Sequence, residues 1–335
     1  MKKFSTALVV GLLSVFSLLT PELAHAAPKV TLTEQRINGA GAVTLDTSLY
    51  LPLKSPAPAI LLAHGFTGDK NSVAAQARTL AEHGYVVITW TARGFGKSTG
   101  EISMNSPKGE VADVSKLIDY LSTRREVIQQ RTNDPLVGIA GDSYGGAISL
   151  MTAGYDQRID AVAANITWNN LNHVLFPQNS EDLSPGPYKK FWAGTFFALA
   201  TLPNAFGGEC GTFAKEWCTA FKDAVATGTP TAADEKLLLA SSPSTITSKI
   251  TAPTLLMQGE ADSLFPLTES IANAQGIHDA HPKVPLAMIW HSGGHDGGTD
   301  ESKRLQQATS DWFDKYLLNE KISFPVFQVT DTNGS

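Results

Sequence analysis

Short, largely apolar runs alternate with stretches of helical periodicity along most of the chain. The runs expected to form buried strands are residues 57–63, 85–90, 136–140, 159–166, 253–259 and 284–290. Between them, apolar residues recur at helical spacing, as in the stretch 111–121. Buried strands separated by helices are typical of parallel sheets covered on both faces. The pattern therefore predicts an α/β fold built on a mostly parallel, doubly wound sheet.

Two segments depart from this alternation. Residues 29–37 and 42–53 alternate polar and apolar side chains, which predicts an antiparallel hairpin with Asn38-Gly39 near its turn. Residues 168–250 are rich in aromatic side chains and interrupt the strand–helix order. We expect this stretch to be a helical cap insertion over the carboxyl ends of the strands, where it would wall a ligand crevice. The alternative is a set of additional core helices.

The N-terminus has the pattern of an export signal. A basic Lys2-Lys3 pair precedes an apolar stretch from Ala7 to Leu19, and Ala24-His25-Ala26 has the form of a cleavage site. A membrane anchor is the alternative, but the apolar stretch is shorter than the roughly 20 residues that span a bilayer. We therefore expect residues 1–26 to be a signal peptide, and residues 27–335 to be secreted or periplasmic without stable membrane association.

The bulk composition narrows the class of protein. The chain has 335 residues, of which 42% are hydrophobic, and a formal net charge of −6. This length suffices for one large α/β domain or two small ones. No basic stripe is present, so we expect no nucleic-acid partner. The two cysteines, Cys210 and Cys218, lie close together, and in an oxidising compartment we expect them to form a local disulfide.

A candidate nucleophile follows the apolar run at 135–140. The sequence Gly141-Asp142-Ser143-Tyr144-Gly145-Gly146 places G-x-S-x-G between a predicted strand and a predicted helix. The glycines permit a sharp, strained turn, because larger side chains would collide with the neighbouring strand or helix. Such a turn lifts a serine hydroxyl out of the sheet. We therefore expect Ser143 to be a catalytic nucleophile, the alternative being an ordinary glycine-rich turn.

A serine nucleophile needs a base, and the base needs a carboxylate to orient it. Asp262 follows a predicted strand and is the candidate acid, with Glu260 as the rival and a helix-capping role as its structural alternative. His295 is the candidate base, because the glycines around it allow its loop to bend back over the serine. His291 lies nearer the strand, and we expect it to be structural. The order serine, acid, histidine is that of α/β-hydrolases.

Backbone donors for an oxyanion are expected on both sides of the serine. One is the N–H of Tyr144, and the other is the N–H of Phe66 in the loop His64-Gly65-Phe66-Thr67-Gly68. The alternative for this loop is an ordinary glycine-rich turn. His64 precedes that turn without clustered ligands, so we expect it to be a hydrogen-bonded structural residue. The sequence implies no metal and no organic cofactor.

These motifs carry a family resemblance. From residue 27 onward the chain resembles the α/β-hydrolase superfamily, and it is most similar to the branch with X-prolyl dipeptidyl peptidases of family S15 and cocaine-esterase-like acyl hydrolases. Three segments support this likeness: the G-x-S-x-G turn at Ser143, the Gly294-His295 pair and the turn Arg93–Gly100. The turn resembles the R-G-x-G-x-S-x-G of that branch, and we expect it to shape the loop beside the site. The resemblance implies an α/β-hydrolase fold.

The chain departs from that branch in two respects. Members of the branch typically carry a jelly-roll domain after the catalytic domain, whereas only residues 321–335 follow here. Some relatives also offer a tyrosine hydroxyl to the oxyanion, whereas Phe66 can offer only its backbone. The substrate of a relative therefore does not transfer directly to this chain.

The sequence favours a secreted serine hydrolase that cleaves carboxylic esters through an acyl-enzyme, with an aromatic cap suited to a hydrophobic acyl or alcohol group. The alternative is an X-prolyl dipeptidyl peptidase, which needs an acidic group such as Glu181, Asp182 or Glu209 to hold the substrate amine. A binding protein on a hydrolase scaffold is disfavoured by the full set of triad candidates. A dehalogenase usually needs an aspartate at the position of Ser143. The expected partner is a small ester or a short peptide, and no oligomeric state is predicted.

Overall fold

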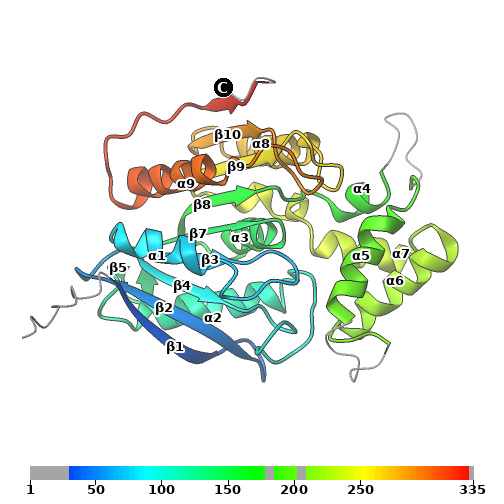
Figure 1. The fold of residues 1–335 in the computed structure, drawn as a ribbon, viewed down its shortest axis with the longest axis horizontal. Coiled ribbons are helices and arrows are strands. Elements are labelled where there is room, and N and C mark those ends of the chain that lie inside the picture. Colours follow the sequence, from blue (N-terminus) through cyan, green and yellow to red (C-terminus); the bar gives the residue numbers. More distant parts are fainter. Residues whose placement is uncertain (1–29, 178–184, 202–208, 332–335) are drawn as a thin grey trace, which may run out of the picture.

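A nine-stranded sheet runs through the centre of the protein (Figure 1). The computed structural model describes residues 30–177, 185–201 and 209–331. The strand order is β1-β2-β4-β3-β7-β8-β9-β10-β11, with antiparallel pairing at β1–β2 and β2–β4 and parallel pairing elsewhere. The strands are β1 Val30–Asn38, β2 Thr44–Pro52, β3 Ala59–Ala63, β4 Val86–Trp90, β7 Val137–Asp142, β8 Ile159–Asn165, β9 Thr254–Gly259, β10 Leu286–His291 and β11 Phe327–Val329. A separate short pair consists of β5 Gln129–Arg131 and β6 Asp134–Pro135.

Helices cover both faces of the sheet. On one face lie α2 Glu110–Ser122, α3 Tyr144–Tyr155 and α8 Leu267–Ala280, and on the other lie α1 Ala74–Glu82 and α9 Ser302–Leu317. Strand β3 shows why its sequence is apolar throughout: Leu61 packs on the α2–α3 side, whereas Ile60 and Leu62 pack on the α1–α9 side. Each fully buried aliphatic side chain of this kind contributes about 1.5–3 kcal/mol. The predicted doubly wound α/β sheet is confirmed.

Two details of the fold differ from the sequence pattern. Helix α8 runs through Gly276 to Ala280, although glycine disfavours a helix interior. Gly276 packs tightly against Thr247, and a Cβ at this position would collide with the threonine Oγ1. The edge strand β11 was not predicted. It has three residues and an exposed side chain at each end, so it shows neither a buried run nor a long alternation.

The aromatic stretch forms a helical insertion between β8 and β9. Its helices are α4 Leu171–Leu175, α5 Lys190–Thr201, α6 Lys215–Thr227 and α7 Ala232–Ala240, followed by 3₁₀ turns at Pro243–Thr245 and Thr247–Lys249. The four α-helices gather beside one end of the sheet (Figure 1). Buried Ile102 joins the insertion to the sheet domain, because its N–H donates to Thr212 O and its carbonyl accepts from Ala214 N–H. We call residues 168–250 the cap.

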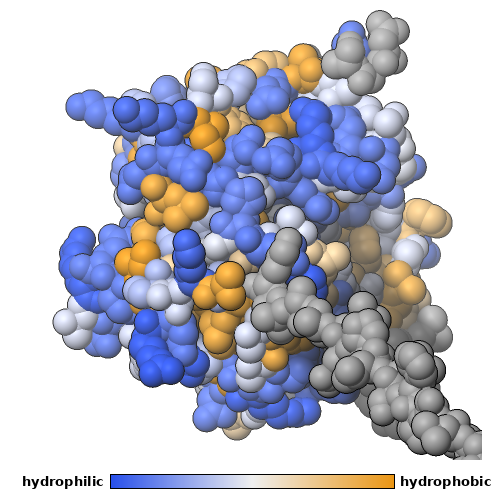
Figure 2. Space-filling model, turned by 60° about the vertical axis from the view of Figure 1, so that its left-hand side comes forward, coloured by the Kyte–Doolittle hydropathy of each residue, from blue (hydrophilic) through white to orange (hydrophobic). Residues whose placement is uncertain are grey.

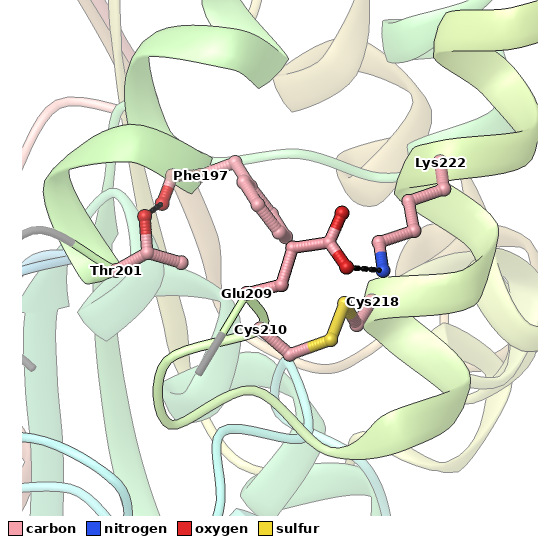
Figure 3. Close-up of a disulfide and its surroundings, with 6 residues drawn as sticks. All are labelled: Phe197, Thr201, Glu209, Cys210, Cys218 and Lys222. Atoms are coloured by element: carbon pink, nitrogen blue, oxygen red, sulfur yellow. Dashed lines mark hydrogen bonds and ion pairs between the residues drawn. A yellow bond between two sulfur atoms is a disulfide. The ribbon is translucent and has the colours of Figure 1, made fainter. Parts of the chain in front are cut away.

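A disulfide joins Cys210 to Cys218 within the cap (Figure 3). Cys218 lies in the first turn of α6 and is buried, so the bond ties the preceding loop to that helix. Beside it, Lys222 Nζ donates to Glu209 Oε2 at 2.8 Å (Figure 3). Phe197 of α5 stacks on Phe221 of α6, with ring centroids 3.8 Å apart. The loop, the disulfide and the stacked rings together fix α5 against α6.

The surface is mixed in character. On the face drawn in Figure 2, hydrophilic residues predominate and hydrophobic residues form separate patches among them. Scattered apolar side chains of this kind are normal on a folded protein. Within the described ranges, no helix has the length and apolar character needed to cross a bilayer.

Arg93 connects the turn after β4 to the rest of the domain. Its guanidinium donates to both carboxylate oxygens of Asp113 in α2, each at 2.7 Å. The same carboxylate accepts the N–H of Ala40 in the β1–β2 connection at 2.7 Å. The side chain of Asp113 is 2% exposed, so the ion pair is shielded from water. This is a structural use of the Arg93–Gly100 turn.

We predict that Arg93→Ala lowers the free energy of unfolding by about 3 kcal/mol, because it leaves the buried Asp113 carboxylate without its charge partner. Urea denaturation measures this change. The matched control is Lys97→Ala, in the same turn but exposed, which should change stability by less than about 0.5 kcal/mol. Equal stability of the two variants would contradict the structural role of Arg93.

Candidate active site

Ser143 occupies a strained turn between β7 and α3. Its backbone has φ 57° and ψ −115°, a region that costs a non-glycine residue roughly 1–3 kcal/mol. The neighbouring backbones leave no room for side chains on either side of it. A Cβ on Gly141 would lie 2.6 Å from the Gly145 backbone, and one on Gly145 would lie 2.6 Å from Ala63 O in β3. The glycines of the motif therefore let helix and strands approach closely enough to hold the turn.

The structure brings Ser143, His295 and Asp262 together in a hydrogen-bonded chain. The Ser143 hydroxyl donates to His295 Nε2 at 2.9 Å. His295 Nδ1–H donates to Asp262 Oδ2 at 2.7 Å, which defines the tautomer that leaves Nε2 free to accept a proton. The Asp262 side chain has 0% exposure and that of His295 has 12%. This is the geometry in which a serine hydroxyl can be deprotonated by a base held in one orientation.

The second oxygen of Asp262 is also fully engaged. Oδ1 accepts the N–H of Leu264 at 3.0 Å and the N–H of Phe265 at 2.8 Å. Three hydrogen bonds therefore compensate the burial of this carboxylate and prevent it from rotating.

The rival residues have other partners. Glu260 is exposed, and its N–H donates to the carbonyl of His291. His291 is buried, and its Nε2 lies 3.0 Å from Asn165 Oδ1. His64 Nδ1–H donates to Gly65 O at 2.7 Å, and its Nε2 accepts the N–H of Ala92 at 2.9 Å. Burial lowers the pKa of both histidines and keeps their rings neutral.

The two residues expected to donate their backbone N–H groups to an oxyanion are in contact through their side-chain rings. The N–H of Tyr144 is the first of helix α3, where backbone N–H groups have no acceptor within the helix and the helix dipole favours an anion. Phe66 follows β3, and its ring contacts that of Tyr144 with centroids 5.5 Å apart. Both residues line the pocket that contains Ser143.

Tyr144 is held from its side chain as well as its backbone. Its hydroxyl donates to Glu110 Oε1 at 3.0 Å, and its carbonyl accepts from Asn105 Nδ2 at 2.8 Å. Burial raises the pKa of Glu110, and burial together with this carboxylate raises the pKa of Tyr144. The phenol therefore stays protonated as a donor, and the residue behind Ser143 has a fixed orientation.

An apolar pocket of about 130 Å³ opens beside Ser143. Its wall is mainly aromatic and comes from both the sheet domain and the cap. The aromatic lining residues are Phe66, Tyr144, Trp168, Phe176, Tyr188, Phe196, Phe197, Phe213, Trp217, Phe221 and Phe265. Among the described lining residues, Asp234 alone carries a formal charge. Its Oδ2 accepts the N–H and hydroxyl of Thr231, in a capping box at the start of α7.

The acidic residues considered for binding a substrate amine lie elsewhere. Glu209 pairs with Lys222, and it does not belong to the described lining of the pocket. Glu181 and Asp182 lie outside the described residues. In the part of the chain that the structure describes, no group of three histidine, cysteine or acidic residues is arranged to hold a metal ion.

Glu301 supports the loop that carries His295, and sequence analysis did not identify it. Its carboxylate accepts the N–H and hydroxyl of Ser292, at 2.8 and 3.0 Å, and pairs with Arg304. Burial opposes its ionisation, but the hydrogen bonds from Ser292, Thr330 and Arg304 prevail and lower the pKa of Glu301 to about 2. The sequence offers no signal for this role, because Glu301 lies among polar residues just before α9, as many surface glutamates do.

The parallel sheet, the strained serine turn and the hydrogen-bonded serine, histidine and aspartate define a serine hydrolase of the α/β-hydrolase fold. The sequence model of the family described as X-Pro dipeptidyl-peptidase (S15 family) matches residues 39–297. The chain belongs to this family, and the resemblance inferred from the motifs is confirmed.

Curated relatives match only part of the chain. An uncharacterised 31.7 kDa protein of Escherichia coli is 30% identical over 112 residues, which cover 33% of this chain and 37% of that protein. The polyketide transferase grgF of a Penicillium species is 25% identical over 116 residues, covering 34% of this chain and 37% of the transferase. The chain thus spans less than half the length of these relatives in the matched regions.

Solved structures share the fold at low identity. A CocE/NonD family hydrolase of Staphylococcus aureus has a TM-score of 0.63 and 14% identity, with 92% of this chain and 59% of that chain covered. An esterase of Pyrococcus furiosus has a TM-score of 0.57 and 13% identity, with 86% and 93% covered. The acylaminoacyl peptidase of Pyrococcus horikoshii has a TM-score of 0.59 and 17% identity, with 89% and 44% covered. Esterases and peptidases thus occur on the same fold.

We predict that Glu301→Gln destabilises the protein at neutral pH by on the order of 2 kcal/mol, because the amide binds Ser292 and Arg304 more weakly than the carboxylate. The pKa of Glu301 is lower in the folded state than its ordinary value of 4.5. Its stabilisation is therefore complete above about pH 4.5 and is lost as the pH falls toward 2.

Denaturant unfolding from pH 7 to pH 3 tests this dependence. The difference between wild type and Glu301→Gln should stay constant from pH 7 to about pH 4.5 and shrink below that pH. Glu82→Gln, at an exposed position, serves as the control and should show no comparable trend. A difference that stays constant over the range would refute the role of the Glu301 charge.

Proposed function

We propose that the protein is a secreted carboxylic ester hydrolase that works through an acyl-enzyme on Ser143. The observation that carries this proposal is the chain of hydrogen bonds from Ser143 through His295 to Asp262, at the edge of an apolar pocket. A serine hydroxyl is a poor nucleophile, and acyl transfer requires a base that removes its proton and a carboxylate that orients this base.

In the proposed mechanism, Ser143 Oγ attacks the ester carbonyl carbon while its proton passes to His295 Nε2. Asp262 stabilises the resulting imidazolium. The N–H groups of Tyr144 and Phe66 bind the oxyanion of the tetrahedral intermediate. Its collapse expels the alcohol, which takes the proton from His295. A water molecule, deprotonated by His295, then attacks the acyl carbonyl, and the carboxylic acid leaves as Ser143 regains its proton.

The pocket favours an ester with a hydrophobic acyl or alcohol part. Its described lining offers aromatic and aliphatic side chains, and its one carboxylate is engaged by Thr231. An apolar group gains about 25 cal/mol for each Å² that such a wall removes from water. A charged substrate amine, by contrast, would lose its hydration there without a free carboxylate to replace it.

The second candidate function is that of an X-prolyl dipeptidyl peptidase. The family match and the presence of Asp234 in the pocket wall favour it. In that function the Asp234 carboxylate would have to leave Thr231 to bind the substrate amine, which would remove one half of the capping box of α7.

Export is part of the proposal. We assign residues 1–26 as a signal peptide, which lies outside the described residues, and residues 27–335 as the catalytic domain with the cap at 168–250. The Cys210–Cys218 disulfide supports an oxidising destination. The proposed partner is a small ester, with a short peptide as the alternative.

We predict that the protein hydrolyses p-nitrophenyl esters with an initial burst of nitrophenol, because the acyl-enzyme accumulates. An X-Pro anilide should be cleaved at under about 1% of the ester rate. Ser143→Ala should lose at least about 10,000-fold in kcat and should no longer react with a fluorophosphonate. Strong anilide cleavage with negligible ester turnover would instead establish the peptidase.

We predict that the pocket sets the acyl preference. Ala193→Phe places a ring where α5 lines the pocket, and it should lower kcat/KM for p-nitrophenyl octanoate about tenfold while leaving the acetate within about twofold. Ala198→Phe is the matched control, since Ala198 lies on the same helix but is exposed. Equal losses for octanoate and acetate would show that the acyl chain binds elsewhere.

A further inference from the structure

Lys189 reaches from the cap to the loop that carries Asp262. It directly precedes α5, and its ammonium donates to the carbonyl oxygens of Ser263 at 2.6 Å and Leu264 at 3.0 Å. One flexible cap side chain is thus bound to two consecutive peptide groups of the sheet domain. Neither carbonyl belongs to a helix or a strand, so the loop conformation depends on such side-chain contacts.

These two peptide groups are the ones that hold the triad acid. The Ser263 carbonyl shares a peptide plane with the Leu264 N–H, and the Leu264 carbonyl shares one with the Phe265 N–H. Both N–H groups donate to Asp262 Oδ1, at 3.0 and 2.8 Å. A cation on the carbonyl side polarises each peptide group and strengthens its N–H as a donor. Lys189 and Asp262 are therefore hydrogen-bonded to opposite sides of the same two peptide groups.

A second contact joins the same parts. Trp192, in the first turn of α5, donates its indole N–H to Ser263 Oγ at 3.2 Å, and that hydroxyl donates to Asp296 Oδ1 at 2.8 Å. Asp296 is the residue after His295. The Trp192 ring also lies 6.1 Å from the His295 ring, centroid to centroid, in an edge-on arrangement. The start of α5 is thus connected to both catalytic loops.

Lys189 is only partly exposed. Burial lowers the pKa of its ammonium, while the carboxylates of Glu269, Asp262 and Asp296 act in the opposite sense. Its neighbour Lys190 is exposed. Lys190 therefore serves as a matched control for Lys189, since both are lysines at adjacent positions and only Lys189 contacts the loop after Asp262.

We propose that Lys189 is a positioning residue for catalysis, which orients Asp262, and through it His295, by binding the Ser263 and Leu264 carbonyls from the cap. The inference rests on the proposed roles of Ser143, His295 and Asp262. It makes the triad dependent on the docked cap even for substrates too small to fill the aromatic pocket.

The test compares wild type with Lys189→Met, Lys189→Arg and Lys190→Met, using p-nitrophenyl acetate and a fluorophosphonate. In Lys189→Met we expect kcat and the rate of fluorophosphonate labelling to fall about tenfold with KM nearly unchanged, because the acid loop loses its orientation. Lys189→Arg should restore most of the rate, since a guanidinium also donates to two carbonyls. Lys190→Met should match wild type.

Proton NMR supplies a readout that a purely structural role would not move. The downfield resonance of the His295 Nδ1–H, identified by its loss in His295→Ala, should shift upfield and broaden in Lys189→Met and return in Lys189→Arg. Should Lys189→Met fail to fold by circular dichroism, the comparison moves to Lys189→Gln, which keeps a polar side chain too short to reach both carbonyls.

The outcomes separate this inference from the proposed function. If wild type itself resists the fluorophosphonate, the proposed function fails. If wild type reacts and a folded Lys189→Met or Lys189→Gln reacts equally fast with an unchanged resonance, the role of Lys189 is refuted. A rise in KM at constant kcat would also overturn it, because Lys189 would then serve substrate binding alone.

Discussion

The crowding of backbone around Ser143 is the constraint on which the rest of the site depends. Gly145 packs against the last carbonyl of β3, and Gly141 packs against the start of α3, so the serine is held in a conformation it would not adopt in isolation. The same close approach brings Phe66, which follows β3, next to Tyr144, which begins α3. Sheet packing thus supplies the energy for the strained turn, and Phe66 and Tyr144 line the same pocket as Ser143.

The wall of the apolar pocket and the carboxylate that is hydrogen-bonded to His295 share one loop. Leu264 and Phe265 bind Asp262 through their N–H groups and line the pocket with their side chains. Lys189 of the cap holds the carbonyls on the opposite side of the same peptides. The cap therefore both lines the apolar pocket and contacts the loop that holds Asp262.

Periodicity and motifs were reliable guides where burial is uniform. The strand at 57–63 is apolar because both faces of β3 are covered. Its burial could therefore be predicted from its sequence alone. Prediction was weaker where a distant contact decides the outcome. Gly276 would usually weaken a helix, but it lies inside α8 where Thr247 leaves no room for a side chain. Glu301 and Lys189 were not identified, because their importance comes from loop carbonyls and N–H groups that lie next to them only in the folded chain.

The sequence by itself determined the class of fold, the strained serine turn and the order of the chemical groups, because these depend on local composition and spacing. Only the tertiary structure decided which carboxylate meets which histidine, and what encloses them. Ser143 and His295 are 152 positions apart, and they meet because the carboxyl ends of parallel strands converge at one edge of the sheet. The sequence already favoured Asp262 over Glu260, and the folded loop supplies the direct contact, because it buries Asp262 against His295 and leaves Glu260 exposed.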